Sequence, residues 1–231
     1  MKRKILIIIG VIVAIIIGII GYFVVVDLNQ ESKLQNELTE LSNLVNEENI
    51  DIDKINKKLN TITTTGDYAI VEKAYKNYLS DNFNNIIEMT NLLNDEIITA
   101  SLTVDNYKED GKDFKNTKEY LKETIQDLEE CKNKYYEFLT EEKAMSYINN
   151  KNLDSYYIDF YKNEIMGDIE SERNDTTVED SLNDVISLLQ NSEKVINFLS
   201  DNKDSWNIEG ENIVFNSDDL TSKYEELINN L

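Results

Sequence analysis

The chain has 231 residues, of which 45 are Asp or Glu and 23 are Lys or Arg, so its formal net charge at pH 7 is −22. The sequence has no histidine, so it lacks the groups for Ser-His-Asp or Cys-His catalysis. With one cysteine it also lacks the ligands for a zinc or iron–sulfur site, and we expect no cofactor. The charge disfavours binding to nucleic acid, which requires clusters of Lys and Arg, and favours basic partners.

Residues 1–4 carry three basic side chains, and the run from Ile5 to Val26 is apolar and uncharged. A helix of residues 5–26 spans about 33 Å, enough to cross the hydrocarbon core of a bilayer. The alternative is a cleaved signal peptide, but its apolar region is about 7 to 15 residues long and ends at a small-residue cleavage site. We therefore predict an uncleaved, single-pass anchor in the cell membrane, with a cytoplasmic N-terminus and residues 27–231 outside.

Within this run, Gly10, Ala14 and Gly18 recur at four-residue spacing. Small residues at this spacing let two membrane helices approach closely, so they are a candidate helix–helix contact and a homodimer is one expected assembly. Such patterns also arise by chance, and the sequence does not choose between these explanations.

Residues 27–65 show apolar side chains at alternating intervals of three and four, which predicts a heptad stalk helix. No Pro or Gly lies between Gly21 and Gly66, so the membrane helix can continue outward as one rod, with a break allowed near residues 49–53. The partner helix belongs either to a second chain or to the same bundle. The predicted contact residues are Leu34, Leu38, Leu41, Val45, Ile52, Ile55 and Leu59.

Residues 66–231 are predicted to form an acidic helical bundle, because amphipathic helices follow one another and none would persist alone. The helical spacing of apolar residues is lost only at residues 206–215. There, two short apolar runs flank Glu209-Gly210-Glu211-Asn212 and predict a β-hairpin. The expected helices are 67–100, 116–139, 152–169, 177–199 and 217–231, with a loop at 105–113. The predicted fold is therefore all-α, with one N-terminal transmembrane helix, an extracytoplasmic helical bundle and coiled-coil region, and a small C-terminal hairpin.

Candidate chemical sites are few. Adjacent acidic pairs such as Glu129-Glu130 and Asp218-Asp219 point in different directions on a helix and are expected to be solvated. The segment 105–117 has Lys108 and Thr117 where a calcium loop needs carboxylates, which excludes an EF-hand. Cys131 and Trp206 are expected to be packing residues.

Four aromatic residues lie close together at 156–161. An exposed aromatic platform can bind glycans or quaternary amines, whereas the alternative for such residues is core packing with their hydroxyl groups at the rim. The residues concerned are Tyr156, Tyr157, Phe160 and Tyr161.

These features predict a non-enzymatic, membrane-anchored protein of a bacterial cell envelope, whose acidic helical ectodomain engages another protein. The alternative is a sensor-like helical module that binds an extracellular ligand and acts with a membrane partner. A hydrolase that uses carboxylates alone is a third and weaker hypothesis.

Overall fold

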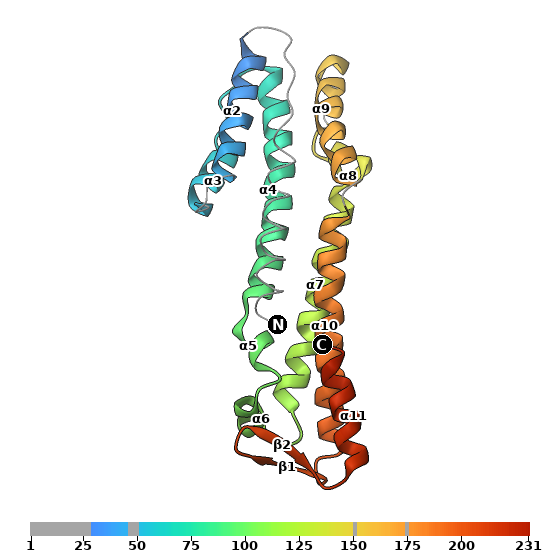
Figure 1. The fold of residues 1–231 in the computed structure, drawn as a ribbon. Coiled ribbons are helices and arrows are strands. Elements are labelled where there is room, and N and C mark those ends of the chain that lie inside the picture. Colours follow the sequence, from blue (N-terminus) through green and yellow to red (C-terminus); the bar gives the residue numbers. More distant parts are fainter. Residues whose placement is uncertain (1–28, 46–50, 150–151, 174–175) are drawn as a thin grey trace. The chain divides into compact units, whose positions relative to one another are not determined.

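The computed structural model describes residues 29–45, 51–149, 152–173 and 176–231 (Figure 1). Over these residues the chain is mostly helical and has one small antiparallel hairpin near its C-terminus, which confirms that part of the predicted fold. No helix in the described part of the chain has both the length and the apolar character needed to cross a membrane. The predicted anchor at residues 5–26, including Gly10, Ala14 and Gly18, lies outside the described residues.

The described elements follow one another with short connections. They are α2 (Gln30–Val45), α3 (Ile52–Leu59), α4 (Asp67–Asn94), α5 (Glu96–Ala100), α6 (Val104–Asp110), α7 (Lys115–Phe138), α8 (Glu141–Ser146), α9 (Ser155–Arg173), α10 (Thr177–Asp201), β1 (Trp206–Glu209), β2 (Asn212–Phe215) and α11 (Asp218–Asn229).

The chain divides into two compact units, each built from two separate stretches of sequence. Unit 1 contains Met89–Lys132 and Glu179–Leu231. Unit 2 contains the described residues up to Glu88 together with those of Asn133–Val178. The division falls inside α4, α7 and α10, so each of these helices supplies residues to both units. No linker is visible in the sequence because the chain passes between the units within helices.

In unit 2, α2 and α3 pack against each other instead of forming one rod. The helix α3 begins after an extended residue, Asp51, whose carboxylate accepts a hydrogen bond from the Lys54 backbone N–H at 3.0 Å. The Lys58 ammonium then reaches back to α2, at 3.0 Å from Glu37 and 2.5 Å from Glu40. The segment predicted as a stalk therefore has a helix boundary where the sequence allowed a break, and it folds back on itself.

In unit 1, the segment predicted as a loop at 105–113 instead contains the short helix α6, whose N-cap is Thr103. The next helix, α7, starts at Lys115, after Phe114 with a positive φ of 51°. Its first N–H groups are satisfied by the Asp110 carboxylate, which accepts from Asn116 N at 3.2 Å and Thr117 N at 2.8 Å. The cap of α7 is thus supplied by a residue six positions before Asn116.

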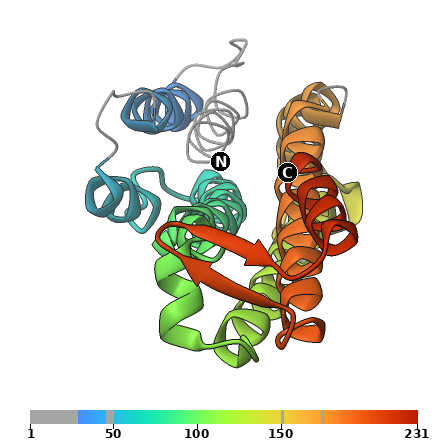
Figure 2. The same ribbon diagram turned by 60° about the horizontal axis from the view of Figure 1, so that its bottom comes forward.

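The hairpin lies at the predicted position, and in its register Trp206 is opposite Phe215 and Glu209 is opposite Asn212. Gly210, with φ of 66°, is the first residue of its two-residue turn, as type II′ hairpin turns require. Figure 2 shows the hairpin lying across the end of unit 1, and α11 follows it with Ser217 as N-cap.

The Trp206 indole helps to fix the hairpin to the rest of unit 1. Trp206 is 1% exposed, donates from Nε1 to the Leu199 carbonyl at 2.8 Å and stacks on Phe114 at 6.1 Å between ring centroids. The Lys112 ammonium lies 4.6 Å from the centroid of the Trp206 ring and donates to the Trp206 carbonyl. These contacts confirm Trp206 as a packing anchor. Cys131 is also buried, as expected.

Candidate functional site

Most of the predicted heptad residues belong to the apolar core of unit 2. Of these residues, Leu34, Leu38, Leu41, Ile55 and Leu59 are at most 5% exposed. Ile52 is 43% exposed, and Val45 is the last residue of α2. The buried members are therefore covered within the chain and do not form a free surface for a second protein.

A buried ion pair lies between the core of unit 2 and its α2–α3 layer. The Glu72 and Lys76 side chains, one turn apart on α4, are 0% and 1% exposed, and their charged groups lie 2.6 Å apart. The Lys76 ammonium also donates to Glu37 at 3.1 Å and to the Thr61 carbonyl at 2.6 Å. This arrangement gives the buried ammonium three oxygen partners, which is what makes the burial of a charge tolerable.

The Glu72 carboxylate is satisfied from the other side by the connection between α3 and α4. It accepts from the Thr64 backbone N–H at 2.8 Å, from the Thr64 hydroxyl at 2.7 Å and from the Thr63 backbone N–H at 3.0 Å. Burial raises the pKa of Glu72, but the hydrogen bonds from Lys76 and Thr64 outweigh it, and the pKa lies below its ordinary value. Every charge in the pair is compensated, so this cluster is a structural clasp and has no free group for chemistry.

A second cluster in unit 2 contains one exposed aromatic ring and three half-buried ones, and we call it the aromatic–carboxylate cluster. Tyr68, at the start of α4, meets Tyr157 and Phe160 of α9 edge to face, with ring centroids 5.1 and 6.1 Å apart. Tyr156 packs on Tyr157 in the same way at 5.2 Å and is 52% exposed. Tyr161, which the sequence grouped with these residues, is fully buried and donates to the Ala144 carbonyl at 2.8 Å.

Two carboxylates complete this cluster. Glu31 of α2 is 4% exposed, and its contact is a long hydrogen bond of 3.4 Å from the Tyr68 hydroxyl. Burial and the nearby charge of Glu31 both raise the pKa of Glu164 on α9. Burial, with added contributions from Tyr156 and Glu31, also raises the pKa of Tyr68. Among the described residues, no Lys or Arg forms an ion pair with either carboxylate.

The magnitudes show that Glu31 is poorly compensated. Its place in the first turn of α2 gains about 0.3–1 kcal/mol from the helix dipole. Removing a carboxylate from water costs on the order of several kcal/mol, even after relaxation. Among the described residues, the helix dipole and one long hydrogen bond act on the Glu31 carboxylate, and a bound cation would add to them. Glu31 thus differs from Glu72, which has a full set of partners.

The last part of the chain is its most acidic stretch, with 12 Asp or Glu and three Lys between Glu179 and Leu231. Lys223 pairs with Asp219 at 2.8 Å and Lys203 with Asp113 at 2.7 Å, so these lysines neutralise little of the local charge. The exposed carboxylates, which we call the C-terminal acidic surface, are Asp201, Asp204, Glu209, Glu211, Asp218, Asp219, Glu225 and Glu226.

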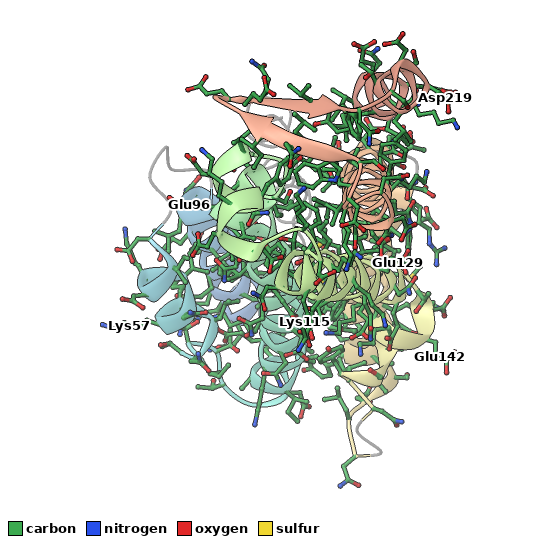
Figure 3. The ribbon with its side chains drawn as sticks, turned by 90° about the horizontal axis from the view of Figure 1, so that it is seen from below. Lys57, Glu96, Lys115, Glu129, Glu142 and Asp219 are labelled. Atoms are coloured by element: carbon green, nitrogen blue, oxygen red, sulfur yellow. The ribbon has the colours of Figure 1, made fainter. Side chains whose placement is uncertain are left out.

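The acidic pairs that the sequence placed on solvated faces are indeed exposed. Figure 3 shows Glu129, Glu142 and Asp219 on three different helices, and each is exposed together with its acidic neighbour. Within the part of the chain that the structure describes, no three Asp, Glu or Cys side chains gather closely enough to hold a metal ion. The segment considered as a calcium loop forms α6 and the turn that follows it.

An open cavity of about 640 Å³ lies beside α8 in unit 2. Its volume is within the range of about 300–1,000 Å³ that is usual for small-molecule sites. Its lining joins apolar side chains with three polar ones at the rim, and no group in it is both buried and uncompensated. The lining residues are Glu142, Met145, Ser146, Ile148, Asn149, Leu153 and Ile158.

Known proteins provide no relative from which a function could be transferred. No protein-family model matches the chain, and no curated protein or solved structure is significantly similar to it. Any function must therefore be argued from the residues themselves.

Proposed function

We propose that this chain is a non-enzymatic, membrane-anchored protein of the cell envelope that engages a second protein with a basic surface. The anchor is the apolar run 5–26, with the N-terminus in the cytoplasm and the helical units outside. The observation that carries the proposal is the C-terminal acidic surface, where exposed carboxylates of α11 and the hairpin greatly outnumber lysines.

A surface of one sign acts on partners over distance. It raises the local concentration of a cationic partner and speeds its association, and this attraction weakens as salt rises. The same field repels a second copy of the same surface, so a homodimer would have to form elsewhere, for example through Gly10, Ala14 and Gly18 of the anchor. The absence of histidine from the sequence supports a non-enzymatic role.

The test is crosslinking of the full-length protein in its native membrane, at low and at high salt. The test variant replaces four exposed carboxylates with amides: Glu209, Glu211, Glu225 and Glu226. The matched control makes the same charge change on α7, at Glu123, Asp127, Glu129 and Glu130, which are also exposed.

We expect a crosslinked partner whose yield falls severalfold in high salt and in the test variant, but not in the control. Equal losses in both variants would show that only net charge matters. A salt-insensitive yield, or a crosslinked homodimer alone, would contradict a basic partner.

The second candidate function, a helical module that binds a ligand, is favoured by the aromatic–carboxylate cluster. Among the described residues, the buried Glu31 carboxylate forms no ion pair with Lys or Arg and belongs to the same cluster as the exposed ring of Tyr156, which favours a binding site for a cation.

A further inference from the structure

We infer that the aromatic–carboxylate cluster of unit 2 binds a small alkylammonium cation, meaning an amine whose nitrogen carries methyl groups and a permanent positive charge. This inference deepens the second candidate function and rests on it. It is independent of the C-terminal acidic surface, which belongs to unit 1.

The aromatic rings of the cluster offer a surface that attracts a cation. A cation is attracted to the face of an aromatic ring within about 6 Å of its centroid. Tyr156, Tyr157 and Tyr68 form a chain of rings spaced by 5.2 and 5.1 Å, with interplanar angles of 85° and 89°. In an edge-to-face pair the edge of one ring covers part of the face of the other, so the ring most available to a cation from solvent is Tyr156. More than half of Tyr156 is exposed, which leaves the cluster open to solvent.

The two carboxylates of the cluster, Glu31 and Glu164, provide negative charge next to the rings. Glu31 is almost fully buried, and Glu164 lies near enough for the charge of Glu31 to act on it. Two neighbouring carboxylates repel each other, and among the described residues no Lys or Arg pairs with them. A bound cation would remove that repulsion and compensate the burial of Glu31.

The same features select the kind of cation. Calcium takes about six to eight oxygen ligands, whereas only two carboxylates and tyrosine hydroxyl groups are present here. A primary amine needs up to three acceptors for its N–H groups. A methylated ammonium has few or no N–H groups, presents apolar methyl groups to the rings, and needs only diffuse negative charge. Anions are excluded by Glu31 and Glu164.

The experiment is isothermal titration calorimetry of the full-length protein with choline, with its uncharged isostere dimethylbutanol, and with calcium. We expect saturable binding of choline and at least a tenfold weaker response to dimethylbutanol. Calcium is expected not to compete with choline beyond the effect of ionic strength. Equal binding of the uncharged isostere would overturn the proposal, because the site would then be only an apolar pocket.

Matched variants locate the site. Tyr156→Leu removes an exposed ring and Tyr156→Phe keeps it, so we expect binding to weaken about tenfold in the first and to stay within about twofold in the second. Glu31→Gln is expected to weaken binding at least as much, whereas Glu142→Gln, an equal charge change at an exposed position, should not. If Glu142→Gln and Glu31→Gln had equal effects, the attraction would be nonspecific.

The ligand-binding function as such is tested separately. The measurement is the unfolding temperature of the protein in the presence of glycans and other uncharged ligands. If choline fails to bind but another ligand raises the unfolding temperature, the ligand class proposed here is wrong and the ligand-binding function survives. If no ligand stabilises the protein, both are wrong.

Discussion

Glu72 and Glu31 are both buried carboxylates of unit 2, yet their surroundings differ in kind. Glu72 has an ammonium, two backbone N–H groups and two hydroxyl groups around it. Among the described residues, Glu31 has one long hydrogen bond. Because burial is costly unless the charge is compensated, the first arrangement holds the fold together, and the second supports the cation site proposed above.

The buried clasp formed by Glu72 and Lys76 gives a prediction for a single residue. Glu72→Gln leaves Lys76 buried with a weaker neighbour, so we expect the free energy of unfolding at pH 7 to fall by about 1.5–3 kcal/mol. The folded-state pKa of Glu72 is lowered, so its carboxylate stabilises the fold above the ordinary value of 4.5 and this contribution is lost as pH falls below it. Urea unfolding at several pH values should therefore show the difference from wild type shrinking on acidification.

The control for this variant is Glu88→Gln, which removes one partner of the exposed pair with Lys134. It should cost less than about 1 kcal/mol, since surface pairs contribute little. A loss at Glu72 that is no larger than the loss at Glu88, or that does not depend on pH, would contradict the clasp.

At the scale of elements, the starts and ends of helices depend on where acceptors and donors lie in space. Ser217 caps α11 from the adjacent position, and this kind of cap is visible in sequence. Asp110 supplies the same hydrogen bonds to α7 across the turn that contains Phe114. Hydrogen bonds from Thr117 and Asn116 hold the pKa of Asp110 below its ordinary value, although burial alone would raise it.

Two glycines provide a matched pair of variants. Gly210 has φ of 66° in the hairpin turn, so Gly210→Ala is expected to lower the free energy of unfolding by about 1–2 kcal/mol. Gly167 lies within α9 in an ordinary helical conformation, so Gly167→Ala is expected to raise it by up to about 1 kcal/mol. A Cβ atom at either position would meet nothing within 4 Å, so the two differ in backbone conformation only. Urea unfolding of the two variants measures both changes in the free energy of unfolding. If the two changes had the same sign, backbone conformation would not explain them.

At the scale of the molecule, 45 acidic and 23 basic side chains make like-charge repulsion the dominant electrostatic effect. Raising NaCl from about 10 mM to about 200 mM shortens the screening length to below about 10 Å and weakens both repulsion and surface ion pairs. Because the repulsion outweighs the ion pairs, we expect the thermal unfolding temperature to rise. Magnesium chloride at equal ionic strength is the control for screening, and a fall in unfolding temperature with NaCl would show that ion pairs dominate.

The sequence by itself determined the properties that depend on neighbouring residues. The hydrophobic period located most helices, the Gly210 turn located the hairpin, and composition fixed the charge and excluded histidine chemistry. It missed α6, α8 and the division of 67–100 into α4 and α5, because helices of five to seven residues have too few turns for a period to appear.

Only the tertiary structure decided what depends on distant residues. The same heptad pattern fits a rod or a fold-back, and the contacts of Lys58 with Glu37 and Glu40 select the fold-back. Tyr156, Tyr157 and Phe160 were visible as a group, but Tyr68 and Glu31 come from other helices and join them only through packing. Local patterns record which face of a helix is apolar. They do not record which other helix will cover it, and the candidate cation site depends on that.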